Sequence, residues 1–168
     1  MQNARDTFYV TLRDRLAALN PARTMVLRGV TRPGVLVEEN ELASAVEPVD
    51  AFCLRWTGLS VDAKGALPLA TMVCEIRYAT DGSSGNGGMD RGRLLSAMDG
   101  ELVGAMSGAP QNTVKMNYGA ASVGAAPVSM ATNVFWGDAV FGATVVKGER
   151  LERVATVEVF SYQEAGEL

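Results

Sequence analysis

The residues with the clearest potential for chemistry lie in the glycine-rich segment 82–88, which reads GSSGNGG. This segment follows an alternating, strand-like run at residues 70–78 and precedes an amphipathic helix that begins at Asp90. A strand, a glycine loop and a helix can together cradle a phosphate, because the backbone amides and the helix dipole both attract anions.

The details of this segment argue against a nucleotide site. A P-loop needs a lysine and a hydroxyl residue after its last glycine, and residues 82–88 contain no lysine. The dinucleotide fingerprint also fails, because Asp90 follows Gly85 and Gly87 where a third glycine is required. A carboxylate at a helix start stabilises the helix dipole and repels phosphate. We therefore interpret residues 81–89 as a mobile surface loop.

No other motif supplies catalytic chemistry. The chain contains no histidine, which excludes Ser-His-Asp and Cys-His pairings. Carboxylate pairs such as Glu38 with Glu39 are typical of a solvated face, although sequence alone leaves open a pair that converges in space. We expect no catalytic residue, no cofactor and no metal.

The two cysteines, Cys53 and Cys74, each lie inside an apolar, strand-like run. Two cysteines without a histidine argue against a zinc site. We expect buried thiols in a reducing compartment, and a disulfide between neighbouring strands is the alternative.

Composition narrows the class of protein. The chain has 168 residues, 48% hydrophobic residues and a net charge of −4, as expected for one soluble domain with a proper core. The negative charge gives no reason for broad nucleic-acid binding. The apolar runs are too short to span a membrane, and the polar N-terminus lacks a signal-peptide core. We expect a cytoplasmic protein at synthesis.

Periodicity predicts the elements that position these residues. Apolar residues spaced by three or four predict helices at 4–19 and 90–106, and alternation predicts a hairpin from residues 51–79 with its turn at Lys64 and Gly65. Further predicted features are a short strand at 25–27, a turn at 31–34, a continuation at 35–37, an acidic loop at 38–50, and a closing hairpin within 132–163 that turns at 147–148. This order predicts an α+β fold, a mostly antiparallel sheet with two helices packed on one face.

One segment fits no element. Residues 107–131 are rich in small and polar residues, carry only one charge, at Lys115, and lack a clear period. We interpret this segment as a long, flexible arm of the single domain 1–168 that becomes ordered against a partner. The aromatic residues of the predicted strands are expected in the core rather than in a ligand pocket: Trp56, Phe135, Trp136 and Phe141.

The order of elements resembles that of the tail-terminator, or tail-completion, proteins of long-tailed phages and prophages. The nearest local similarity is the run CEIRYATDG at residues 74–82, which leads into DRGR at residues 90–93. The resemblance implies a non-catalytic subunit of a six-membered ring that caps the tail tube and meets the head-completion or neck protein. It also implies no cofactor, no sequence-specific nucleic-acid binding and a final place in the virion tail.

On this resemblance, the acidic segment and the two loops become candidate contacts with a neighbouring subunit or the tube. The candidate interface residues are Glu38, Glu39, Glu41, Ser83, Asn86, Met89, Lys115, Met116 and Tyr118. The alternative function is a small α+β enzyme or ligand-binding domain of unknown substrate, with a pocket near Arg55, Arg77 or Asp138.

Overall fold

The computed structural model describes residues 1–41, 48–82, 85–108, 110–119 and 126–167. The helices are α1 (Gln2–Leu19), α2 (Glu38–Glu41) and α3 (Met89–Ser107), with a 3-10 turn, η1 (Asn86–Gly88), before the last. The strands are β1 (Thr24–Leu27), β2 (Val30–Pro33), β3 (Val35–Val37), β4 (Phe52–Asp62), β5 (Leu69–Thr80), β6 (Asn112–Asn117), β7 (Val128–Trp136), β8 (Val140–Phe141), β9 (Val145–Lys147) and β10 (Arg150–Tyr162).

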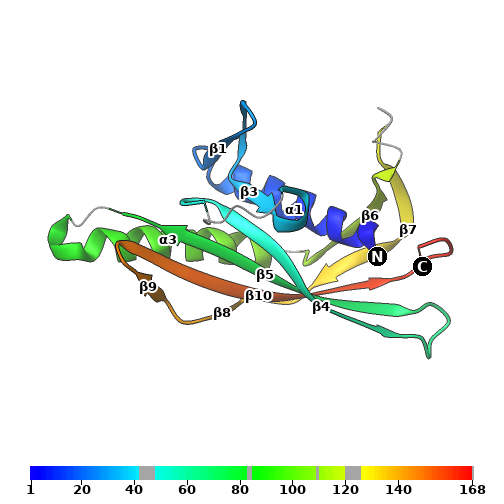
Figure 1. Ribbon diagram of the computed structural model, residues 1–168. Coiled ribbons are helices and arrows are strands. Elements are labelled where there is room, and N and C mark those ends of the chain that lie inside the picture. The colour runs from blue at the N-terminus through cyan, green and yellow to red at the C-terminus, as the bar shows by residue number, and fades with distance from the viewer. Residues whose placement is uncertain (42–47, 83–84, 109, 120–125, 168) are drawn as a thin grey trace.

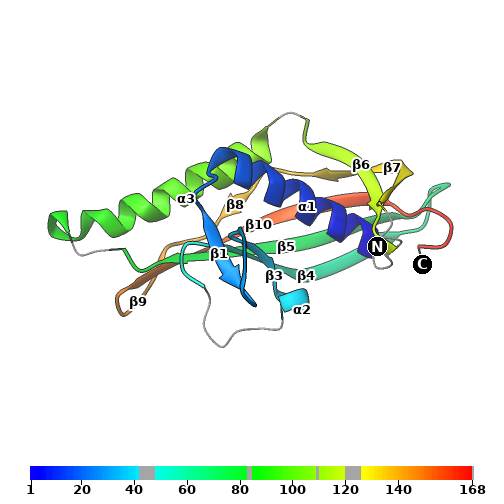
Figure 2. The same cartoon turned by 90° about the horizontal axis from the view of Figure 1, so that it is seen from above.

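Most strands form one sheet in the order β3-β4-β5-β10-β7-β6. All of these pairings are antiparallel except that of β3 with β4. On the side of β10 away from β5, three strands follow one another along its length, namely β9, β8 and β7. Both long helices lie on one side of this sheet (Figure 1, Figure 2). The expected α+β fold is therefore confirmed.

The central strands show why one sheet face is buried. In β5, every second residue from Ala70 to Tyr78 is almost fully buried, and the residues between them are partly exposed. Because side chains alternate across a strand, this pattern places the buried set under the helices and leaves the other face open.

The helices supply the other half of the core. Phe8 of α1 makes edge-to-face contacts with Trp56 and Trp136, at centroid distances of 5.9 and 5.7 Å. The remaining helical core residues are Ala4, Leu12 and Leu16 of α1 and Leu95, Met98, Leu102, Ala105 and Met106 of α3. This apolar spacing is the one from which the sequence predicts two amphipathic helices.

Helix α1 also covers the outer edge of β6. The backbone amide of Met116 donates to Thr7 Oγ1 at 2.9 Å, and Thr7 Oγ1 itself donates to the Asn3 carbonyl at 2.6 Å. The end of this edge strand therefore bonds to a helix side chain.

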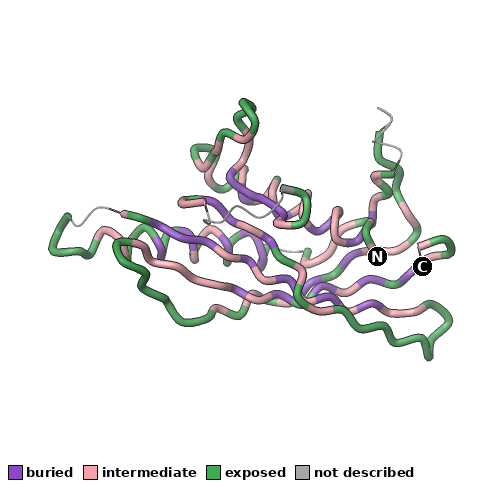
Figure 3. The backbone as a smooth tube through the Cα atoms, viewed as in Figure 1, coloured by how far each residue is buried: buried purple, intermediate pink, exposed green. Residues whose placement is uncertain are grey.

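The hairpin of β4 and β5 extends beyond the helices as an arm. The register shifts between Trp56 and Gly58, so that Leu59 and Val61 pair with Met72 and Ala70 on the helix-bearing face. Neither long helix reaches this far, and Leu59 and Val61 are 47% and 43% exposed. Figure 3 shows the end of this hairpin as exposed.

Strands β1 and β2 form a separate two-stranded sheet that projects from the helix-bearing side (Figure 1). The pairing of Leu27 with Val30 leaves Arg28 and Gly29 as a two-residue turn, with φ angles of 50° and 80°. The expectation of a turn at residues 31–34 is wrong, because residues 30–33 are strand β2. The Arg-Gly pair supplies the turn instead, in the place where Asn-Gly is common.

The expected arm at residues 107–131 is wrong for residues 112–117 and 128–131, which belong to strands β6 and β7. Their alternation is obscured because the β6–β7 register shifts between Val114 and Met116. The acidic loop also differs from expectation, since residues 38–41 form helix α2. Ser83 and residues 42–47, 109 and 120–125 lie outside the described residues.

Among the described residues, no helix combines the length and the apolarity needed to cross a bilayer.

Candidate interaction surfaces

The candidate interface residues do not gather on one surface. Asn86 begins η1 and Met89 begins α3, and both are exposed, at the end of the molecule away from the β4–β5 arm (Figure 1). Glu38 and Glu39 lie in α2, as does the backbone of Glu41. Met116 and Tyr118 are half-buried beside α1. Ser83 lies outside the described residues.

Lys115 is buried, so the structure corrects its assignment to an exposed arm. Its side chain is 0% exposed. The ammonium group donates to the Tyr162 carbonyl and to Glu167 Oε2, both at 2.6 Å, and lies 3.6 Å from Glu164 Oε1. Lys115 lies at the register shift of β6, which turns this residue inward. The cluster of Lys115, Glu164 and Glu167, which we call the tail cluster, fastens residues 163–167 to the sheet.

Glu164 of the tail cluster fills a gap in the backbone pairing between β6 and β7. Three residues of β7 lie opposite Lys115 at the register shift. Two amides of that segment, those of Ala131 and Thr132, donate to the Glu164 carboxylate at 3.2 and 2.9 Å, and the Thr132 hydroxyl donates at 2.7 Å. The carboxylate thus takes the place of a strand partner.

These contacts lower the pKa values of both tail-cluster carboxyls. The Thr132 hydroxyl is the main cause that lowers the pKa of Glu164 from 4.5 to about 2, despite partial burial, and the two amides and Lys115 add to it. Burial opposes ionisation of Glu167, but the Glu164 amide and Lys115 outweigh it and lower the pKa of Glu167. Both side chains are therefore ionised at neutral pH. This arrangement serves structure, since each charge is paired inside the fold.

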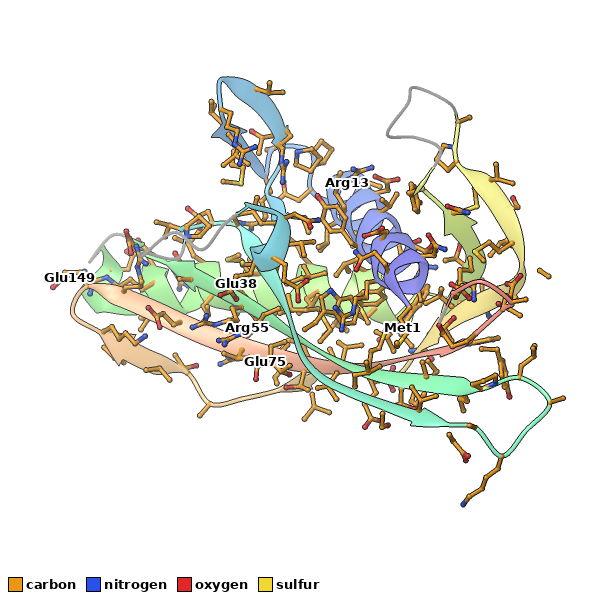
Figure 4. The ribbon with its side chains drawn as sticks, turned by 45° about the vertical axis from the view of Figure 1, so that its right-hand side comes forward. Met1, Arg13, Glu38, Arg55, Glu75 and Glu149 are labelled. Atoms are coloured by element: carbon orange, nitrogen blue, oxygen red, sulfur yellow. The ribbon has the colours of Figure 1, made fainter. Side chains whose placement is uncertain are left out.

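The sheet face away from the helices is a second surface. Figure 4 shows Glu38 near Arg55, and Arg55 Nε lies 3.6 Å from Glu38 Oε2. Arg55 pairs directly with Glu75 across the sheet. Arg77 shares this face, so Arg55 and Arg77 line an open surface, whereas Asp138 accepts from Gln111 at 2.7 Å on a different part of the fold. The structure does not bring these three residues into one pocket.

The same open face carries an aromatic patch. Phe135 and Phe160 are direct cross-strand neighbours, and Tyr162 follows on β10. Phe135 is 39% exposed and Tyr162 is 43% exposed. The expectation that all four strand aromatics belong to the core is therefore wrong for Phe135, because its position in β7 points away from the helices. We call Phe135, Phe160, Tyr162 and the neighbouring Val73 the aromatic patch.

A crevice between α1, α3 and β7 is filled by packed side chains. It is lined by Phe8, Thr11, Leu12, Arg15, Ala105, Met106 and Trp136. Arg15, the charged member of this lining, donates to the carbonyls of Ala105, Gly108 and Pro110 at 2.8–3.1 Å. Its guanidinium lies 4.9 Å from the Trp136 ring centroid. Arg15 thereby satisfies carbonyls at and just beyond the end of α3, and both of its terminal nitrogens donate within the fold.

The two cysteines differ in burial, and Cys74 offers little reactivity. Both are thiols, as expected, with Cys74 buried and Cys53 half-buried. Burial raises the pKa of the Cys74 thiol far above its usual range, which keeps it protonated and a poor nucleophile. Within the described ranges, no three Cys, Asp or Glu side chains converge as a metal site would require.

Comparisons with known proteins give limited information. No protein-family model matches the sequence, and no curated protein matches it significantly. A solved structure whose title states no function has a similar fold, with a TM-score of 0.50 and 15% identity over 99% of each chain. A chain from "Virion of native gene transfer agent (GTA) particle" matches over 92% of this chain and 94% of its own, at 15% identity, but its TM-score of 0.33 is too low to carry an argument.

Proposed function

We propose that this chain is a structural subunit of a phage-like tail, acting as a tail terminator that assembles into a ring. The observation that carries the proposal is the distribution of its uncovered apolar surface. Apolar side chains are exposed on the β1–β2 hairpin, on the β4–β5 arm and on the open sheet face, and these surfaces point in different directions (Figure 1, Figure 3).

This distribution favours assembly over catalysis. An enzyme or ligand-binding domain concentrates its functional groups in one concave site. Here the largest exposures are spread over separate strands, with Val26 at 67% in β1, Val30 at 63% in β2 and Val140 at 70% in β8. Separate apolar patches on one small chain are typical of a subunit that meets several neighbours.

The partners of the proposed subunit are further copies of itself, in a six-membered ring, together with a tail tube protein and a head-completion or neck protein. A closed ring requires head-to-tail contacts between two different surfaces of each copy. The β1–β2 hairpin on the helix-bearing side and the open sheet face are candidates for such a pair of surfaces. No catalysis and no cofactor belong to this role.

Light scattering on a sizing column across a concentration series, with negative-stain images of the largest species, tests the proposal. We expect a closed ring with a mass of about six chains, populated more strongly as the concentration rises. Addition of an assembled tail tube serves as the second arm, because a tube end can template the ring. A chain that forms no closed ring in either arm would contradict the proposed function.

A further inference from the structure

The turn of the β1–β2 hairpin presents a cation that the described part of the fold does not pair. Arg28 is exposed, and no described residue is its hydrogen-bond or ion-pair partner. It occupies a left-handed turn position, with φ at 50°, where asparagine or glycine fits with less strain. The flanking Val26 and Val30 are 67% and 63% exposed. Because Val30 pairs with Leu27 and Val26 with Thr31, the hairpin tip carries a positive charge with one exposed valine on each of its two faces.

The opposite side of the molecule carries the complementary features. Glu158 pairs with Val73 in the sheet, so its side chain projects from the open face. It is exposed, and no described residue is its hydrogen-bond or ion-pair partner. Phe160 lies two residues along the same strand and pairs with Phe135. The aromatic patch thus has at its border a carboxylate that no described residue pairs with.

These two surfaces match in charge and in apolar character. A guanidinium can pair with a carboxylate and also stack on an adjacent aromatic ring, and apolar side chains around it exclude water from the contact. The hairpin projects from the helix-bearing side, and the patch lies on the other side of the sheet (Figure 1). One chain cannot bring them together, but two copies can.

We propose that the β1–β2 tip of one copy docks on the aromatic patch of the next copy, with Arg28 paired to Glu158. The inference rests on the proposed ring assembly and names the surfaces that build it. The contact joins two different surfaces, so it is heterologous and repeats from copy to copy. A nucleic-acid phosphate is a poorer occupant of Arg28, since the chain has a net charge of −4 and the two flanking valines are apolar.

A charge-swap cycle tests the contact. The variants are Arg28→Glu, Glu158→Arg and the double variant, all at exposed positions. The control is Arg93→Glu on α3, whose side chain is 66% exposed and pairs with Asp90 of the same helix rather than with either surface. Sedimentation equilibrium at low salt measures the dissociation constant of self-association, and circular dichroism verifies folding of each variant.

We expect each single variant to weaken self-association about tenfold or more, because attraction becomes like-charge repulsion. The double variant should recover most of the affinity, and the control should match the wild type. A Val26→Ser variant should also weaken association without altering the charge pair.

Association that survives both single variants, or that the double variant fails to recover, would overturn the inference. Closed rings that persist in Arg28→Glu would retain the proposed function and discard this contact. Open chains that depend on the Arg28–Glu158 pair but never close would retain the contact and discard the ring. A strict monomer at millimolar concentration would overturn the contact, and its failure to close on a tube end would overturn the ring.

Discussion

Lys115 shows how one residue changes the interpretation of a whole segment. In sequence it is the single charge of an otherwise bland stretch, which suggests an exposed arm. In the fold its ammonium is fully buried and bonded to Glu167 and the Tyr162 carbonyl. A buried ion pair stabilises little in net terms, but removing one partner leaves the other charge unpaired in a dry site.

Replacement of Lys115 by methionine is therefore expected to lower the free energy of unfolding by about 3 kcal/mol. The loss arises because Glu167, which is 3% exposed, keeps a charge without its main partner. Urea denaturation at pH 7 measures the change. The control is Lys147→Met, since Lys147 is 61% exposed in its pair with Glu152 and should cost less than about 1 kcal/mol. Equal losses in the two variants would contradict this account.

The tail cluster also predicts how stability depends on pH. The folded pKa values of Glu164 and Glu167 lie below their ordinary value of 4.5, and that of Glu164 is about 2. Carboxyls with lowered pKa values stabilise the fold above pH 4.5, and the contribution disappears as the pH falls toward 2. Urea denaturation between these limits should show a smaller pH dependence for Glu164→Gln than for the wild type. An unchanged slope would contradict the role of Glu164.

At the scale of the element, α3 contains glycines that the monomer does not need. A Cβ at Gly92 or Gly100 would meet no atom within 4 Å, whereas a Cβ at Gly104 would lie 3.2 Å from Leu19 Cδ1. Glycine inside a helix costs about 1 kcal/mol relative to alanine. An alanine at position 100 therefore tests intrinsic helix stability alone, whereas an alanine at position 104 also tests the packing against Leu19.

Gly100→Ala is expected to raise the free energy of unfolding by about 0.5–1 kcal/mol, because alanine loses less backbone freedom on folding. Gly104→Ala should gain less, since Leu19 must shift to admit the new methyl group. Thermal unfolding of the two variants beside the wild type measures the difference. A larger gain at position 104 than at position 100 would contradict the packing found here.

The helices and the two long hairpins could be predicted from sequence because their apolar periods are regular over many residues. The predicted helix at 4–19 and the observed α1 differ only at the start. Strand β6 and the first part of β7, residues 128–131, could not be predicted, because the register shift breaks the period and is completed by Glu164, which lies far along the chain. The candidate surfaces depend on which face of the sheet each strand residue occupies. The sequence around Phe135 does not indicate that its side chain lies on the open face.

The whole molecule combines a rigid centre with projecting ends. Strands β5 and β10 pair along almost their full length and also have neighbours on their outer sides. Strands β1 and β2 pair only with each other in the described part of the chain. Local opening is easiest where few buried contacts oppose it.

Hydrogen exchange of the dilute protein should therefore be slowest at the centres of β5 and β10 and fastest in the β1–β2 hairpin. Mass spectrometry of peptides covering residues 70–78 and 24–33 measures the two rates. Exchange in the hairpin should slow at concentrations where copies associate, while exchange in the centre stays unchanged. Equal protection of both peptides in the dilute protein would contradict this distribution of stability.

The hydrogen bond between the Met116 amide and Thr7 Oγ1 has a consequence for how copies of the chain can associate. An open strand edge recruits further strands by backbone pairing, which is indifferent to sequence and has no natural end. Here the Thr7 hydroxyl of α1 accepts the hydrogen bond of the Met116 amide, so this donor near the end of β6 is already paired. At this point of the edge, cohesion between copies then has to come from side chains of defined identity rather than from backbone pairing.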